Sequence, residues 1–85
     1  MAHTRTTLTG TVTRGGEPVA RAYVQLRDPS DEFTGEVRTR ADGAYRFHLA
    51  PGEWTVVVLT ANGARAERTV TVAAGEDARL DVSLD

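Results

Sequence analysis

Hydrophobic residues alternate with polar ones through most of this chain, and this period of two constrains the fold more than any other feature. The alternation is plain in Ala22–Arg27 and again in Ala44–Leu49. Gly, Pro, Asp or Asn residues interrupt it roughly every 8–12 residues, and no window shows the period of a helix. Because successive side chains of a strand point to opposite faces, the pattern predicts an all-β chain of short strands.

Turn residues divide the chain into seven predicted strands. Asp42-Gly43 and Asn62-Gly63 are typical of tight hairpin turns, because Asp, Asn and Gly accept the positive φ angles that such turns require. We therefore expect the strands on either side of Asp42-Gly43 to pair with each other. The predicted strands lie at 8–14, 22–27, 33–40, 44–49 and 54–59, followed by one that ends at Val72 and a last one over 80–84.

The apolar residues lie on one face of each strand, which favours two sheets that cover each other over a single open sheet. A chain of 85 residues forms one domain. We expect residues 1–7 to be a disordered tail and residues 8–85 to form one antiparallel β-sandwich of seven strands. The predicted core consists of Leu8, Val12, Val24, Leu26, Val37, Tyr45, Phe47, Leu49, Trp54, Val56, Val58, Val70, Val72, Leu80, Val82 and Leu84.

The composition excludes several kinds of chemistry. The chain has no cysteine and no lysine, so it supplies no thiolate nucleophile, disulfide or lysine Schiff base. Neither of its serines, Ser30 and Ser83, has the glycine setting of a nucleophile elbow. We therefore expect a protein that is not an enzyme and that binds no cofactor.

The charge and hydropathy patterns bear on partners and location. Ten arginines are dispersed among twelve carboxylates, whereas a nucleic-acid surface normally has a basic excess. The longest strongly apolar run, Val56–Leu59, is too short to cross a bilayer, and Met1–Thr7 lacks the apolar region of a secretory signal. We expect a cytoplasmic protein with neither a nucleic-acid nor a membrane partner.

Five segments carry a family resemblance that extends over most of the chain. They are Gly10–Thr13, Gly16–Val19, Ala22–Leu26, Thr39–Phe47 and Pro51–Val56. In this order they resemble the carboxypeptidase regulatory-like domain, which is a prealbumin-like or Ig-like β-sandwich. The resemblance implies the same sandwich for residues 8–85.

A second set of segments resembles a smaller family more closely. Asp31–Val37, Tyr45–Phe47 and Gly52–Thr55 are similar to segments of small actinobacterial proteins classed as a domain of unknown function. Members are often encoded beside a thiosulfate sulfurtransferase, which implies an accessory role in sulfur metabolism and a sulfurtransferase as partner. Family members commonly have a cysteine just after the initiator, where this chain has Ala2-His3-Thr4, so any role of that cysteine is absent here.

Arg38, Arg46 and His48 are the candidate residues for anion binding. Side chains at matching positions of paired strands share a face, so these three would form a small cationic cluster. A carboxylate, phosphate or sulfate would fit such a cluster. The acids between them favour the alternative of a solvated outer face.

The loop Asp28–Glu32 places several oxygen atoms close together in the sequence. Asp28, Asp31 and Glu32 are therefore weak candidates for calcium ligands, because calcium prefers oxygen. Their spacing matches no standard calcium loop, and Asp-Pro-Ser-Asp is itself a good turn sequence. We expect no metal site.

Tyr23, Val57 and Leu59 are the candidate residues for an interface. If Val56 and Val58 fill the core, these three side chains point outward, and neighbouring exposed apolar residues are typical of a contact surface. We therefore expect a non-enzymatic accessory or protein-interaction module that binds a protein partner or a second copy of itself. The alternative is a module that binds a small anion or calcium.

Overall fold

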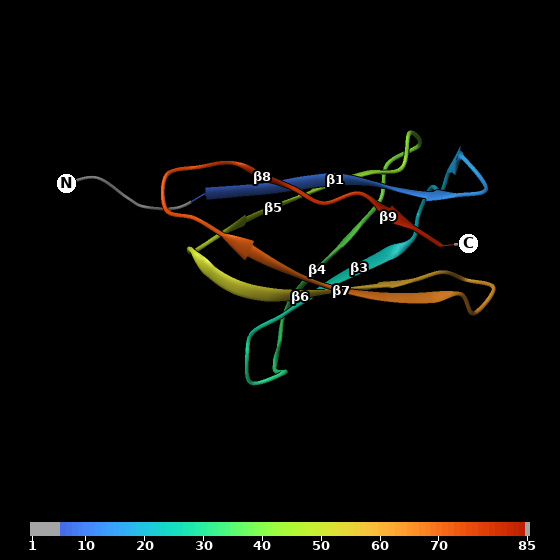
Figure 1. Ribbon diagram of the computed structural model, residues 1–85. Helices are drawn as coiled ribbons and strands as arrows, with labels where there is room; N and C mark the ends of the chain where they lie inside the picture. Colours follow the sequence, from blue (N-terminus) through green and yellow to red (C-terminus); the bar gives the residue numbers. More distant parts are fainter. Residues whose placement is uncertain (1–5, 85) are drawn as a thin grey trace.

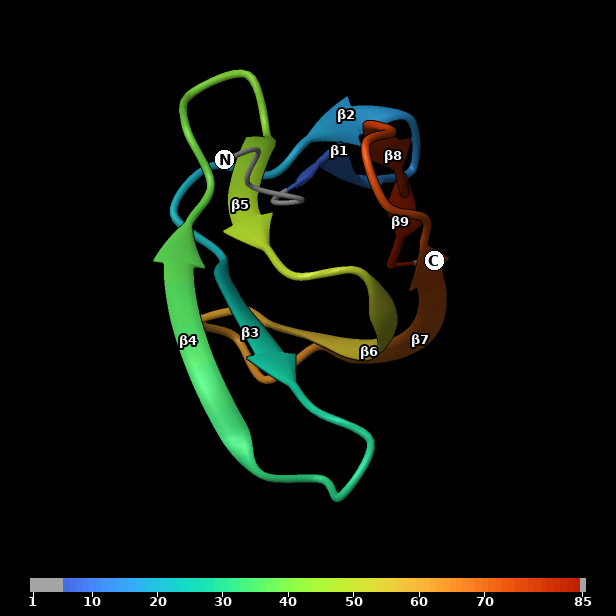
Figure 2. The ribbon, with the colours of Figure 1, turned by 90° about the vertical axis from the view of Figure 1, so that its left-hand side faces the viewer.

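The computed structural model describes residues 6–84, which form nine strands and no helix (Figure 1). The strands lie in two layers that face each other, as Figure 2 shows. This confirms the predicted all-β sandwich. The strands are β1 (Thr6–Arg14), β2 (Glu17–Pro18), β3 (Tyr23–Arg27), β4 (Phe33–Arg38), β5 (Ala44–Leu49), β6 (Gly52–Leu59), β7 (Arg65–Val72), β8 (Ala78–Arg79) and β9 (Val82–Ser83).

Strand β1 is the centre of the first sheet, which we call sheet I. It pairs antiparallel with β2 and β5, and parallel with β8 and β9. The backbone N–H groups of Leu80 and Leu84 donate to the carbonyl oxygens of Thr9 and Thr13, at 2.9 and 2.8 Å. The expectation of a wholly antiparallel sandwich of seven strands is therefore wrong, because the C-terminal segment returns alongside β1 in the same direction.

The second sheet, which we call sheet II, has the strand order β4-β3-β6-β7 and is antiparallel throughout. Its β6–β7 hairpin turns at Asn62-Gly63, as the sequence predicts, with Gly63 at a φ of 92°. Hairpin pairing on either side of Asp42-Gly43 is not found. The tight turn itself forms, but β4 pairs with β3 and β5 pairs with β1, so the turn carries the chain from one sheet to the other.

Strand β1 begins earlier than the sequence suggests. Thr6 and Thr7 pair with β5, and Thr6 is 3% exposed, so these two residues do not belong to a disordered tail. The rest of the expected tail, residues 1–5, lies outside the described residues. No helix in residues 6–84 is long and apolar enough to cross a membrane.

The core lies between the two sheets and consists mostly of the residues that the alternation predicts. Burying one Leu or Val side chain contributes roughly 1.5–3 kcal/mol, so this layer is the main source of stability. Five predicted core residues are only partly buried, namely Val37, Trp54, Val70, Leu80 and Leu84. Val37 lies on the edge strand β4, and Trp54 and Val70 are in register towards one end of β6 and β7. The buried cluster is Leu8, Val12, Ala22, Val24, Leu26, Tyr45, Phe47, Leu49, Val56, Val58, Val72 and Val82.

Gly10 allows the C-terminal segment to approach the centre of sheet I. A Cβ atom on Gly10 would lie 1.8 Å from the carbonyl oxygen of Leu80 and 2.8 Å from the hydroxyl oxygen of Tyr45. That hydroxyl donates a hydrogen bond to the same Leu80 carbonyl. The missing side chain therefore makes room for the contact between β1, β5 and the segment that joins β8 to β9.

Replacement of Gly10 by alanine should destabilise the fold strongly. The added methyl group has no space, and overpacking of this kind costs about 3 kcal/mol or more where backbone atoms must move. Gly35→Ala is the matched control, because Gly35 also lies in a strand and a Cβ there meets no atom within 4 Å. Urea unfolding of both variants measures the difference. Equal stability of the two variants would contradict the close approach at Gly10.

Candidate functional site

The outer face of sheet I carries two arginines on either side of a threonine. Strand β1 turns alternate, half-buried threonines, from Thr7 to Thr13, towards this face. Arg46 of β5 and Arg79 of β8 are both in register with Thr9. Because residues in register share a face, both arginine side chains leave the sheet on the same side as Thr9.

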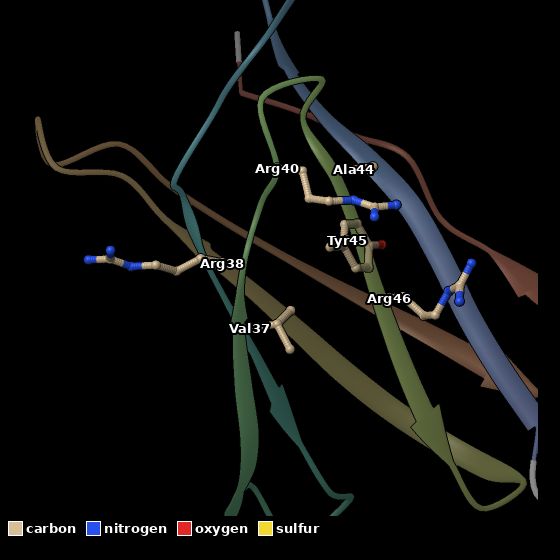
Figure 3. Close-up of a pocket in the computed structure, with 6 residues that line it drawn as sticks. All are labelled: Val37, Arg38, Arg40, Ala44, Tyr45 and Arg46. Carbon is tan, nitrogen blue, oxygen red and sulfur yellow. The ribbon is translucent and has the colours of Figure 1, made fainter.

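Arg40 joins these two arginines from the turn between the sheets. A hollow of about 260 Å³ is lined by Arg40, Arg46 and Arg79 together with Thr9 and Thr11. We call the three arginines the arginine cluster. A neighbouring hollow of about 230 Å³, drawn in Figure 3, shares Arg40 and Arg46.

The backbone that carries Arg40 is held by hydrogen bonds on both sides. Thr39 is buried, its hydroxyl donates to the carbonyl oxygen of Val19 at 2.7 Å, and its N–H donates to that of Ala22 at 3.0 Å. Arg40 itself donates its N–H to the carbonyl oxygen of Ala44 at 2.9 Å. A fixed backbone on each side means that Arg40 extends from a defined position.

Asp81 lies beside the arginine cluster and orients Arg79. Its Oδ1 accepts hydrogen bonds from the N–H and the hydroxyl of Thr11, at 3.0 and 3.1 Å. Arg79 donates to the same carboxylate through Nε at 3.2 Å and forms an ion pair with it at 3.1 Å. The hydrogen bond from Arg79 is the largest cause that holds the pKa of Asp81 below its ordinary value, and the hydrogen bonds from Thr11 lower this pKa less.

The predicted anion-binding group is only partly assembled. Arg46 and His48 alternate on the outer face of β5, as expected. Arg38 is elsewhere, because β4 pairs with β3 instead of β5; its guanidinium carbon lies 4.6 Å from the centre of the Tyr23 ring. In Figure 3 the side chains of Arg40 and Arg46 extend towards β1, whereas that of Arg38 extends the opposite way.

The candidate calcium loop forms a turn. Asp28 accepts hydrogen bonds at its Oδ1 from the backbone N–H groups of Ser30 and Glu32, at 3.0 and 2.9 Å. Asp31 has a positive φ of 67°, which places it in the tight part of the loop. Within residues 6–84 no three His, Cys, Asp or Glu side chains are grouped so that they could hold a metal ion, so Asp28, Asp31 and Glu32 do not converge.

The candidate interface residues differ in exposure. Val57 points to the outer face of sheet II as predicted but is only 2% exposed, so its expected exposure is wrong. Gln25 and Glu67 flank it in register on the two neighbouring strands. Tyr23 and Leu59 are half-buried on the same face.

Phe33 and two arginines of the cluster were missed by the sequence reasoning. Phe33 is 58% exposed, and it is the one large hydrophobic residue that is exposed among residues 6–84. The alternation predicts a strand through Arg40, whereas this residue begins the turn. Arg79 could not be paired with Thr9 from the sequence, because nothing in the alternation shows that β8 lies parallel to β1.

A family model described as a protein of unknown function (DUF1416) matches residues 1–84. The chain belongs to this family. Two relatives, uncharacterized proteins of Mycobacterium tuberculosis H37Rv, are 51% identical to it over 59 residues, which is 68% of this chain and 59% of theirs. An uncharacterized protein of Mycolicibacterium smegmatis is also 51% identical over 59 residues, or 66% of its length. The chain therefore matches less than two thirds of each relative.

Solved structures with little sequence similarity share the fold of this DUF1416 chain. The Bacillus anthracis TIE protein superposes with a TM-score of 0.81 at 17% identity, over 93% of this chain and 17% of that one. The dioxygenase domain of a dioxygenase and carbohydrate-binding fusion from Streptomyces sp. SirexAA-E gives 0.75 at 14% identity, over 99% and 81%. At these identities the likeness establishes the fold alone.

Replacement of Asp81 by asparagine should make stability less dependent on pH. The pKa of Asp81 is lowered in the folded chain, so its carboxylate stabilises the fold above the unfolded value of about 3.8 and stops doing so as the pH falls through the folded value. We expect Asp81→Asn to cost less than about 1 kcal/mol near neutral pH, since the group is exposed, and nothing at about pH 2.

Chemical unfolding at several pH values measures this difference. In an Arg79→Gln background the effect of Asp81→Asn should shrink, because the largest cause of the pKa shift has been removed. A cost that is the same at every pH would contradict the proposed role of the carboxylate.

Proposed function

We propose that this protein is a non-enzymatic, cytoplasmic accessory module that binds another protein through the outer face and free edge of sheet II. The support is an exposed aromatic residue at an edge strand, beside a face with half-buried apolar side chains. Charged side chains and the unpaired backbone groups of the strand edge can bind a partner, and the chain has no cysteine or lysine nucleophile. The observation that carries the proposal is the position of Phe33.

Phe33 lies at the start of β4, which is the edge strand of sheet II. One side of the β4 backbone pairs with β3, and the other side pairs with no strand among residues 6–84. A free strand edge offers N–H and C=O groups to an added strand, and apolar pockets or side chains beside it give specificity. Phe33 therefore supplies an apolar anchor beside a free row of backbone groups.

A row of four side chains crosses the outer face of sheet II. The register places Arg38 beside Tyr23, Tyr23 beside Leu59, and Leu59 beside Arg65. The row has two half-buried apolar side chains in its middle and a cation at each end. Tyr and Arg are the residues that most often anchor protein interfaces, so this row suits a protein surface.

The next row along the same strands carries the opposite charge. Glu36, Gln25, Val57 and Glu67 are in register across β4, β3, β6 and β7. Glu36 accepts a hydrogen bond from Gln25 at 3.1 Å, and Glu67 pairs with Arg65 at 3.1 Å. A partner with alternating rows of charge would match this face, whereas a nucleic acid would be repelled by the acidic row.

The resemblance to proteins encoded beside a thiosulfate sulfurtransferase suggests that enzyme as the partner. Sulfur chemistry would then belong to the enzyme, since this chain has no cysteine. A second copy of the chain is the other protein partner that the experiment must consider. Anion binding is a separate candidate function and rests on the opposite sheet.

Replacement of Phe33 by serine and of Leu59 by threonine should weaken binding without loss of the fold. Truncation of an anchor residue costs about 2 kcal/mol or more, which is roughly a thirtyfold loss of affinity. The measurement combines biolayer interferometry against the sulfurtransferase with sedimentation equilibrium of the chain alone. Ala74→Ser, an exposed change in the loop after β7, is the control and should have no effect.

Weakened binding to the sulfurtransferase supports the proposal and its partner. Self-association that is lost in Phe33→Ser supports the interaction surface with a second copy as the partner. A wild-type chain that is monomeric at high concentration and does not bind the sulfurtransferase would overturn the proposal.

A further inference from the structure

We propose that the arginine cluster on the outer face of sheet I binds a tetrahedral oxyanion, either phosphate or sulfate, free or as the end of a phosphate monoester. The site lies on the sheet opposite to the proposed protein-binding face, so it goes beyond the proposed function and does not depend on it. It differs from the group expected from the sequence, since Arg40 and Arg79 take the place of Arg38.

Three chain segments bring the arginines together. Arg46 and Arg79 flank Thr9 in register on the two strands that neighbour β1. Adjacent strands lie about 4.8 Å apart, so two strand spacings separate the two arginine backbones. Long arginine side chains can close this gap over the small threonine between them, and Arg40 enters from the turn before β5.

The hollow between these side chains is large enough for the anion. Its volume is about 260 Å³, many times the roughly 10–15 Å³ that a cavity needs to hold one water molecule. Besides the arginines, the hollow is lined by Thr9 and Thr11. The Thr9 hydroxyl can donate a further hydrogen bond to the anion.

The charge balance leaves two guanidinium groups available to a ligand. In residues 6–84 neither Arg40 nor Arg46 forms an ion pair. Two carboxylates adjoin the cluster, Asp81 through its contacts with Arg79 and Asp42 two residues after Arg40. Asp81 accepts hydrogen bonds from Thr11 and Arg79, and Asp42 accepts one from the backbone N–H of Ala44 at 3.0 Å. Three arginines against these two carboxylates leave a local positive charge, within a chain whose net charge is −2.

The chemistry of the donors points to a tetrahedral oxyanion. Guanidinium groups bind phosphate and sulfate oxygens through pairs of parallel hydrogen bonds. The donors come from three directions, namely β5, β8 and the turn, and a tetrahedral anion presents oxygens in as many directions. A planar carboxylate presents its lone pairs in one plane, so it matches donors from three directions less well than a tetrahedral anion does.

Asp81 is a positioning residue for Arg79. The carboxylate contacts both Nε and Nη2 of the Arg79 guanidinium, which restricts the direction in which this side chain points and leaves Nη1 to face a ligand. Thr11 holds Asp81 in turn through its N–H and hydroxyl. Less freedom is then lost when the anion binds, because one of its three charged donors is already held in place.

The test is a titration of the full chain with sodium phosphate, sodium sulfate and phenyl phosphate at constant ionic strength. NMR of the backbone amides monitors each titration. Sodium chloride is the reference for unspecific screening. We expect phosphate and sulfate to shift the Thr9, Thr11 and Arg46 amides with saturation, and to raise the melting temperature by mass action. A response to phenyl phosphate that saturates at lower concentration than that to phosphate would assign the site to monoesters.

Arg46→Gln and Arg40→Gln should each weaken binding at least tenfold, since each removes a charged donor. Both side chains are exposed and lie outside the core, so the variants should fold. Arg68→Gln, an exposed arginine of β7, is the matched control and should bind as the wild type does. Phe33→Ser should also bind the anion normally, which separates a failure of this proposal from a failure of the protein-binding proposal.

Three results would overturn the proposal. The first is that chloride produces the same shifts as phosphate and sulfate. The second is that Arg68→Gln weakens binding as much as Arg46→Gln does. The third is that the shifted amides lie away from Thr9 and Thr11.

Discussion

The hydrogen bond from the Tyr45 hydroxyl to the Leu80 carbonyl, made over Gly10, joins three segments that are far apart in the sequence. Burial of the phenol, with a smaller effect of the Asp81 charge, raises the pKa of Tyr45 well above its ordinary value, so the hydroxyl remains a donor. Tyr45 also packs its ring against Phe47 in an edge-to-face arrangement, with centroids 6.1 Å apart. A polar tip and an apolar ring thus let one side chain serve both the core and the C-terminal segment.

This contact determines more than the shape of sheet I. Once the carbonyl of Leu80 is held, the neighbours of that residue lie along β1, with Arg79 opposite Thr9 and Asp81 bonded to Thr11. The arginine cluster therefore exists only when the C-terminal segment is docked, and fold and candidate anion site depend on the same constraint. The residues of the proposed protein-binding face lie on the outer side of sheet II and take no part in this hydrogen bond.

Local sequence patterns are sufficient to predict the strands and the core. They are insufficient where the pairing of strands distant in the sequence decides which residues become neighbours. Tyr45 and Phe47 were assigned to the core from alternation alone, since the side-chain period of a strand is a local property. Asp42-Gly43 correctly indicated a tight turn, but a turn does not specify whether its flanking strands stay paired. The expected neighbours of Arg38 are consequently wrong, because β4 pairs with β3. Val57 shows a related limit, because alternation gives the direction of its side chain and not its burial.

Amide hydrogen exchange of the wild-type chain tests most directly whether the C-terminal segment is an integral part of sheet I. The N–H of Leu80 donates to Thr9 at 2.9 Å and that of Leu84 to Thr13 at 2.8 Å. If docking of this segment and folding of the sandwich are one event, both amides should exchange as slowly as that of Val56 in the centre of sheet II. Rapid exchange at Leu80 and Leu84, alongside full protection of Val56, would contradict the account, because the segment would then detach while the sandwich stays folded.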